Sequence, residues 1–229
     1  MARSAGDAKG RILPRRFYAR DAREVAPELL NKVLVHGHRS GRIVEVEAYV
    51  GDGTDPGSHA HRGRTPRNAT MFGPPGHLYV YFSYGMHWCA NAVCDPEGTA
   101  SAVLIRALAP LGGIEDMRAA RAAARTDRDL ANGPGKLCQA LGLTGHHDGA
   151  DLVDRATGIT ILDDRVPPPT TPAVTPRIGL SAGTDHPWRW SVSGDPNVSR
   201  RVAAPATFIL PGESRGGNIR RLGGTGSAV

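Results

Sequence analysis

Residues 42–49 read RIVEVEAY, an alternating run of apolar and charged side chains that is typical of a half-buried β-strand. Because successive side chains of a strand point to opposite faces, Val44, Val46 and Ala48 share one face, which suits the core. The other face carries two carboxylates and a tyrosine, so it is a poor core face and a good pocket wall. Its residues are Ile43, Glu45, Glu47 and Tyr49.

Two carboxylates at positions i and i+2 allow two interpretations. They can be the acid and base of a glycoside hydrolase, with Cα atoms about 7 Å apart along the strand. The alternative, which we favour, is that Glu45 pairs with one of the many arginines and that only Glu47 takes part in chemistry.

The sequence on either side of this strand predicts one mixed α+β domain. Helices are expected at residues 22–30, 115–130 and 132–143. Strands are expected at 32–37, 41–51, 77–84 and 100–108, with a final pair at 175–181 and 188–194. Residues 51–76 are rich in Gly, Pro, His and Arg and predict a long ordered loop, which in a compact domain is usually functional.

Polar, basic ends flank this domain. Residues 1–14 are expected to be a flexible basic arm, residues 15–199 the domain, and residues 200–229 a disordered basic tail. Over 229 residues the net charge is +6 and the pI is about 9.6, which favours a polyanionic partner. The chain has no apolar run of about 18 residues and no apolar segment near its start, so we expect neither a membrane span nor a secretory signal.

Cysteine usage and motif content argue against bound metals and cofactors. Cys89, Cys94 and Cys138 are too few for a disulfide scaffold or a four-thiolate zinc site, and a reducing cytoplasm is the simplest setting. His146 and His147 are neighbours in a Gly-rich stretch, which favours an exposed loop over a metal site. No phosphate-cradling or dinucleotide-binding glycine motif is present, so no cofactor is expected.

Half of the aromatic residues lie between Phe72 and Trp88. Tyr84 and Met86 flank Gly85 in a predicted turn. There they either pack under the turn or form an exposed apolar wedge, as in proteins that unstack base pairs from the minor groove. The preceding loop supplies cations and neutral donors suited to phosphate oxygens, namely Arg62, Arg64, Thr65, Arg67 and Asn68.

Four segments together carry a family resemblance. They are EVEAYVG, SHAHRGRTPRNATMFGPPGHLYVYFSYGMHWCAN, VLIRALAP and NGPGKLCQALGL. From about residue 15 to 195 the chain resembles the alkyladenine (3-methyladenine) DNA glycosylase family. The resemblance implies a single mixed α+β domain with a curved antiparallel β-sheet core, flanking helices and a protruding β-hairpin. It also implies a monofunctional base-excision-repair enzyme that flips alkylated or deaminated purines, such as 3-methyladenine, hypoxanthine and ethenoadenine, out of duplex DNA.

The resemblance assigns roles to individual residues of this chain. Glu47 matches the catalytic carboxylate that activates water, Arg106 a residue that holds this water, and Ile178 a backbone carbonyl that accepts from it. The flipped base would be sandwiched by Tyr49, His59 and Tyr81, and guanine would be disfavoured by Asn91. Tyr84 matches the residue inserted into the duplex, with Met86 beside it. Residues in segments near phosphates are Arg64, Thr65 and Lys136.

We therefore expect a monomeric, cytoplasmic, nucleoid-associated bacterial enzyme whose partner is double-stranded DNA with a damaged purine. A non-catalytic DNA-damage- or RNA-binding module using the same basic, aromatic face is the alternative. Glu47 distinguishes the two, because an acid on an anion-binding face is costly unless it takes part in chemistry. A glycoside hydrolase is disfavoured by the high pI and by the few Trp and Tyr residues elsewhere.

Overall fold

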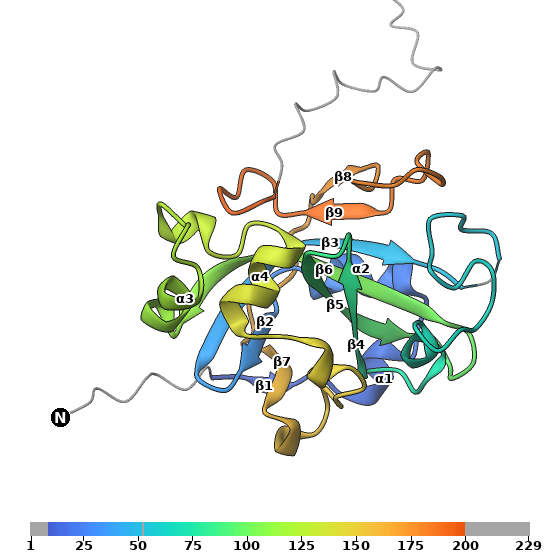
Figure 1. The fold of residues 1–229 in the computed structure, drawn as a ribbon, viewed down its shortest axis with the longest axis horizontal. Coiled ribbons are helices and arrows are strands. Elements are labelled where there is room, and N and C mark those ends of the chain that lie inside the picture. Colours follow the sequence, from blue (N-terminus) through green and yellow to red (C-terminus); the bar gives the residue numbers. More distant parts are fainter. Residues whose placement is uncertain (1–8, 52, 200–229) are drawn as a thin grey trace, which may run out of the picture. The chain divides into compact units, whose positions relative to one another are not determined.

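The computed structural model describes residues 9–51 and 53–199, and its centre is the long strand β3 (Arg39–Tyr49). Residues 1–8 of the predicted arm and the predicted tail at 200–229 lie outside the described residues. β3 pairs with three strands, which places its side chains at the middle of the sheet (Figure 1).

The described chain forms one mixed antiparallel-sheet and helix fold, as predicted. The strand order is β1-β7-β2-β3-β6-β5-β4, and β9 pairs with both β3 and β8. All the pairings are antiparallel. The remaining strands are β1 (Arg11–Ile12), β2 (Val33–His36), β4 (Leu78–Ser83), β5 (His87–Cys94), β6 (Ser101–Gly112), β7 (Ile159–Asp163), β8 (Ala173–Thr175) and β9 (Arg189–Ser191).

Four short α-helices accompany the sheet in the described residues: α1 (Arg15–Tyr18), α2 (Ala22–Leu29), α3 (Ile114–Ala120) and α4 (Pro134–Leu141). The side chain of Asp21 accepts a hydrogen bond from the Arg23 N–H and so caps the start of α2. α4 begins with Pro134 and is capped after Leu141 by Gly142, whose positive φ of 74° suits glycine. The 3₁₀ turns are Ala69–Phe72, Asp127–Asp129, Gly145–His147 and Arg155–Thr157.

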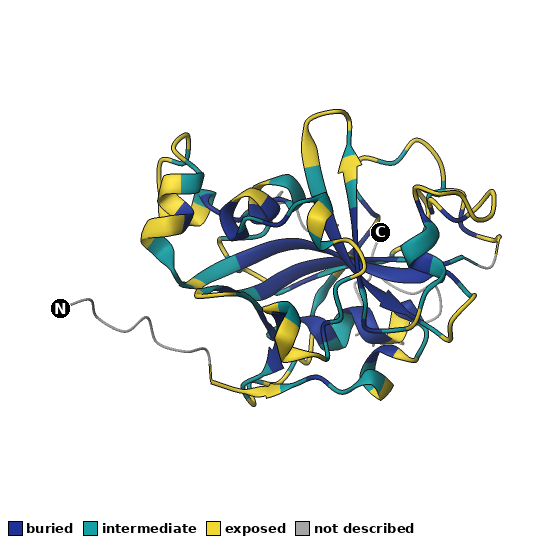
Figure 2. Ribbon diagram, turned by 60° about the horizontal axis from the view of Figure 1, so that its bottom comes forward, coloured by how far each residue is buried: buried dark blue, intermediate teal, exposed yellow. Residues whose placement is uncertain are grey.

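The helices α2 and α4 contribute to the larger of two apolar clusters, on one face of the sheet. Buried side chains of both helices belong to the same apolar cluster as Val46 and Ala48 of β3 and Val103 and Ile105 of β6. The central strands are buried along most of their length (Figure 2). Because strand side chains alternate, the intervening residues of β3 and β6 point to the opposite face.

A β-bulge corrects one detail of the predicted face of β3. The register with β6 shifts between Ile43 and Glu45 and again between Glu45 and Val46. A bulge inserts an extra residue and breaks strict alternation. Ile43 therefore lies in the core cluster with Val46, rather than beside Glu47 as the simple alternation predicted.

Other predicted elements differ in extent. The helix predicted at 115–130 ends at Ala120, and the Arg121 side chain donates to the carbonyl oxygens of Asp129 and Leu130, which holds a turn instead. Short helices depend on packing, and Met117 is the buried side chain of α3. The strand predicted at 175–181 is wrong: β8 lies at Ala173–Thr175, and Pro176 follows it.

Three strands were not predicted. β5 contains two Ala and one Asn, residue types that are depleted in strands. β7 lies at Ile159–Asp163, where no strand was expected from the sequence. Arg11–Ile12, within the expected arm, pairs with β7 as β1, and Leu13 is buried. β4 and β5 pair through an exposed turn at 84–86. That this hairpin protrudes stays a prediction.

Candidate active site

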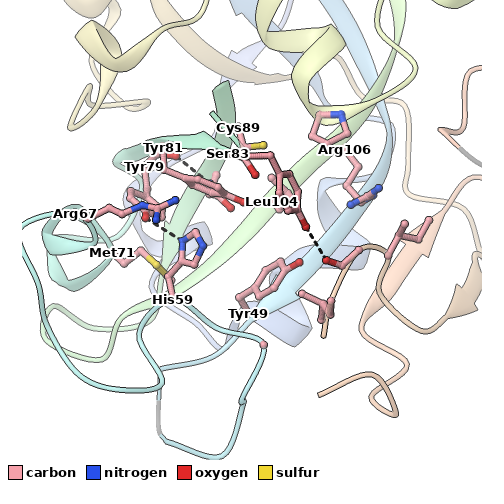
Figure 3. Close-up of a pocket in the computed structure, with 17 residues that line it drawn as sticks. Tyr49, His59, Arg67, Met71, Tyr79, Tyr81, Ser83, Cys89, Leu104 and Arg106 are labelled. Atoms are coloured by element: carbon pink, nitrogen blue, oxygen red, sulfur yellow. Dashed lines mark hydrogen bonds between the residues drawn. The ribbon is translucent and has the colours of Figure 1, made fainter. Parts of the chain in front are cut away.

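A cavity of about 470 Å³ opens on the face of the sheet opposite the helical core. Side chains of β3, β4, β5 and β6 line it, together with residues of the loop before β4, of the segment after β8, and Pro134 at the start of α4. Figure 3 shows Tyr49, His59 and Tyr81 around this cavity, with Arg106 on the side away from His59. The sheet, the long loop and the chain after β8 thus meet at one site.

Glu47 lies directly behind the wall of this cavity. Its side chain is fully buried, and three residues that line the cavity donate to it. Glu47 Oε2 accepts from Tyr49 Oη at 2.9 Å and Arg106 Nη1 at 3.0 Å. Glu47 Oε1 accepts from the Ile178 N–H at 2.7 Å. The carboxylate is therefore held in one orientation from three sides.

Glu45 is the second buried carboxylate of the same face. Its Oε1 accepts from Arg106 Nε at 2.9 Å and from Arg189 Nε at 2.7 Å, and Ser199 donates to both of its oxygens. Burial alone would raise the pKa of Glu45, but the charges of Arg106 and Arg189 outweigh it and leave the pKa below its usual value. The prediction that Glu45 pairs with an arginine is confirmed.

The aromatic side of the cavity is built from one histidine and three tyrosines. The His59 ring lies 4.4 Å from that of Tyr81, and His59 Nδ1 is 3.1 Å from Tyr79 Oη. Burial raises the pKa of Tyr79 and Tyr81, and burial together with Glu47 raises the pKa of Tyr49. Burial, helped by Arg67, lowers the pKa of His59. These four rings are therefore uncharged near neutral pH.

β5 contributes Asn91 and Cys89 to the wall of the cavity. Asn91 is buried on β5 and lines the cavity, and its Nδ2 donates to the Tyr79 carbonyl oxygen at 3.0 Å. That bond fixes which way the amide faces. Cys89 lines the cavity from the same strand, and burial raises the pKa of its thiol.

The turn between β4 and β5 lies at the rim of the cavity. Tyr84 and Gly85 have φ values of 51° and 65°, and the Met86 N–H donates to the Ser83 carbonyl oxygen. Positive φ at both central positions is typical of a type I′ turn and is unfavourable for tyrosine. Tyr84 and Met86 are 78% and 67% exposed, which decides for the exposed arrangement over packing under the turn. Tyr84 Oη donates to the Gly179 carbonyl oxygen at 3.0 Å.

Of the residues suggested for phosphate binding, Arg64, Thr65 and Lys136 lie on the surface and do not line the cavity. Asn68 is instead buried, and its Nδ2 donates to the carbonyl oxygens of His59 and Gly63. The Arg64 guanidinium lies 6.0 Å from the Phe72 ring centre, and Lys136 Nζ donates to Asn132 Oδ1 at 2.7 Å. The Thr65 N–H donates to Asn68 Oδ1. Their roles stay predictions.

Some residues of the site were missed or assigned differently from the sequence. Ile178 donates to Glu47 through its backbone N–H. The family resemblance assigned a role to the Ile178 carbonyl, and that role stays a prediction. The neighbouring Arg177 forms a fully buried ion pair with Asp55. No local pattern marks this pair, because its members lie 122 residues apart. Arg67 was suggested as a phosphate contact, but in the structure it lines the cavity.

The described residues contain neither a metal-binding cluster nor a membrane-spanning helix. No group of three or more His, Cys, Asp or Glu side chains in residues 9–51 and 53–199 is arranged to hold a metal ion. Over the same residues no helix has the length and apolar content needed to cross a membrane.

Comparison with known proteins gives a consistent result. A family model described as methylpurine-DNA glycosylase matches residues 16–196. A Burkholderia lata protein named "Putative 3-methyladenine DNA glycosylase" is 58% identical over 199 residues, which cover 86% of this chain and 94% of the relative. Proteins of the same name from Streptomyces avermitilis and Rhodopseudomonas palustris (strain HaA2) are each 50% identical, covering 82% and 88% of this chain and 90% and 94% of their own lengths.

Proposed function

The chain belongs to the methylpurine-DNA glycosylase family and is a DNA glycosylase of the 3-methyladenine type, and on this premise we propose how it acts. The substrate is an alkylated or deaminated purine, of the 3-methyladenine, hypoxanthine and ethenoadenine class, flipped out of duplex DNA into the cavity. Water activated by Glu47 hydrolyses the N-glycosidic bond. The observation that carries this proposal is the buried Glu47 carboxylate, held by three donors that all line the cavity.

Glu47 acts as the general base. Cleavage of an N-glycosidic bond develops positive charge on the sugar, and a carboxylate at the cavity wall both stabilises this charge and takes a proton from water. A general base typically contributes about 10²–10⁴-fold to the rate. Arg106 and the backbone of Ile178 fix the carboxylate and the water. Arg106 also pairs with Glu45, whose donors Arg189 and Ser199 do not line the cavity. By contrast, the residues that donate to Glu47 do line it, namely Tyr49, Arg106 and Ile178.

The aromatic rings bind the flipped base. Tyr49, His59 and Tyr81 offer faces on which a purine can stack. Because these rings are uncharged, they accept both neutral lesions and cationic alkylated purines, and a cation gains about 0.5–2 kcal/mol per aromatic contact. Asn91 disfavours the 2-amino group of guanine.

The surface around the cavity binds the duplex. Tyr84 fills the gap left by the flipped nucleotide, with Met86 beside it, and the strained turn holds both side chains outward. The exposed Arg64, Thr65 and Lys136 contact phosphates. The enzyme acts as a monomer on double-stranded DNA.

We also propose that the enzyme is monofunctional. A glycosylase with lyase activity attacks the sugar with an amine to form a Schiff base. None of the three lysines lines the cavity: Lys32 Nζ donates to Asp163, Lys136 is exposed on α4, and Lys9 lies before β1. Water is therefore the proposed nucleophile, and the alternative that borohydride trapping tests is the N-terminal amine, which lies outside the described residues.

Incubation of the protein with duplexes carrying a panel of lesions tests the proposal directly. We expect release of free purine, with the strand intact until alkali is added and with no covalent adduct after borohydride treatment. A trapped adduct with nicked strands would overturn the water mechanism. Lesion binding without base release would show a binding module instead of an enzyme.

Replacement of Tyr84 by Ala is expected to slow excision of a paired lesion more than that of a mispaired lesion, whose unstacking costs less. The control is Tyr84→Phe, which keeps the ring and loses the bond to Gly179. It should excise both lesions in the native ratio. Single-turnover rates on matched duplexes measure the effect. Equal losses on paired and mispaired lesions would mean that Tyr84 is only structural.

A further inference from the structure

Arg177 forms the most enclosed ion pair next to the site, and the mechanism above does not use it. Its Nη1 and Nη2 donate to the two oxygens of Asp55 at 2.7 and 2.6 Å, and both side chains have an exposed fraction of 0%. Nη1 also donates to the Ala48 carbonyl oxygen at 3.0 Å, and Nη2 to that of Gly183 at 3.1 Å. A planar guanidinium with this many fixed partners has one available position.

The same guanidinium contacts two aromatic rings. Its central carbon lies 4.6 Å from the ring centre of Tyr49 and 5.1 Å from that of Trp188. Both distances are within the range of cation–π attraction, which is stronger when water is excluded. The Tyr49 ring is therefore held by Arg177 on one side, while its hydroxyl donates to Glu47.

These contacts tie together three segments that each supply a group of the site. Ala48 and Tyr49 end β3, Asp55 belongs to the loop that carries His59, and Arg177 directly precedes Ile178. Arg177 is thus linked to two of the three donors to Glu47. Its guanidinium contacts the ring of Tyr49, and the peptide bond that follows it carries the Ile178 N–H.

We propose that Arg177, clamped by Asp55, is a positioning residue for base excision. It sets Tyr49 and Ile178 at the places from which they orient Glu47, and it fixes the loop of His59 against them. Arg177 does not line the cavity and does not touch the substrate. This inference rests on the proposed role of Glu47.

Variants of the Arg177–Asp55 pair distinguish an effect on the excision rate from an effect on stability. Removing one partner of a buried ion pair leaves an uncompensated charge and is strongly destabilising, whereas replacing both partners by neutral groups is often tolerated. Arg177→Met alone is therefore expected to unfold at lower temperature. The double variant Asp55→Asn with Arg177→Met should recover most of this loss, because no buried charge remains.

The single-turnover rate of base release from a hypoxanthine duplex is the deciding measurement. We expect the double variant to remain about 10²-fold slower than the native protein, since misplacement of a catalytic group by about 1 Å has costs of this order. Affinity for the lesion duplex should change little. Arg177→Lys, which keeps a cation near Tyr49 and loses the two-pronged contact to Asp55, should have an intermediate rate.

A second ion pair provides the matched control. Arg42 and Asp164 form a half-buried pair with a 2.7 Å contact and do not line the cavity. The double variant Arg42→Met with Asp164→Asn should release base at the native rate. Full recovery of activity together with stability in the Asp55/Arg177 double variant would overturn the inference.

The same assay separates failure of this inference from failure of the proposed function. If the native protein releases no base, or if Glu47→Gln releases it at the native rate, the proposed function and this inference both fail. If Glu47→Gln is inactive and the Asp55/Arg177 double variant is as fast as the native protein, only the role of Arg177 fails.

Discussion

Base release by the Glu47→Gln variant is expected to be slower than by the native protein by about 10²-fold or more, the lower end of the contribution of a general base. Gln has the shape of Glu and its carbonyl oxygen can still accept from Arg106, but an amide cannot take a proton from water. Binding of the lesion duplex should change little, because Glu47 is buried behind the cavity wall. Single-turnover release and equilibrium binding measure the two quantities separately.

Glu45→Gln is the matched control for this prediction. Glu45 lies on the same face of β3, is equally buried and shares Arg106, but its other donors in the described chain are Arg189 and Ser199, which do not line the cavity. The variant should lose stability and keep most of its excision rate. Comparable rate losses in both variants would show that the ion-pair network matters as a whole and that Glu47 is not the base.

Replacement of Arg106 by Met is expected to lower the free energy of unfolding by about 3–5 kcal/mol near neutral pH, the usual cost of breaking a buried ion pair. Arg106 bridges Glu45 and Glu47, and its side chain is only 8% exposed. Met fills a similar volume, so the loss reports the missing charge rather than a cavity. Arg106→Lys should lose less, although one ammonium group cannot reproduce the two-nitrogen contact to both carboxylates.

The pH dependence of this loss follows from Glu45. Its pKa in the folded protein is lowered, so the stabilisation by its arginines is present above the ordinary pKa of a glutamate and disappears as the pH falls through the lowered value. The difference between the native protein and Arg106→Met should therefore shrink as the pH falls below the ordinary pKa of a glutamate. Urea unfolding at several pH values measures it. A difference that is independent of pH would contradict the assigned electrostatic cause.

Local pattern in the sequence accounts for the polar face of β3 and fails at its bulge. Alternation correctly places Glu45 and Glu47 on one side, and their shared contact with Arg106 confirms it. Ile43 departs because the bulge depends on pairing with β6, whose residues lie about sixty positions further along the chain. The alternation of residues within one strand carries no information about the strand with which it pairs.

Local pattern in the sequence could not show which distant segments meet at the site. The Ile178 N–H that holds Glu47 lies in a stretch that the sequence favoured as a strand, and the two residues are 131 positions apart. In the structure Pro176 follows β8, Gly179 has a φ of 81°, and the chain between them turns towards β3. The family resemblance singled out Ile178, but only the fold shows which of its backbone groups faces the carboxylate.

Because side chains alternate across the sheet, neighbouring residues of one strand serve the core and the cavity in turn. In β6, Val103 and Ile105 belong to the core, whereas Leu104 and Arg106 line the cavity. Apolar exchanges at Val103 and Ile105 act through the core, whereas changes at Leu104 and Arg106 also alter the wall of the cavity. Deletion of one residue within β6 would exchange the two sets. A change in length within β6 is therefore expected to disturb the core and the cavity together, whereas a substitution acts at one position.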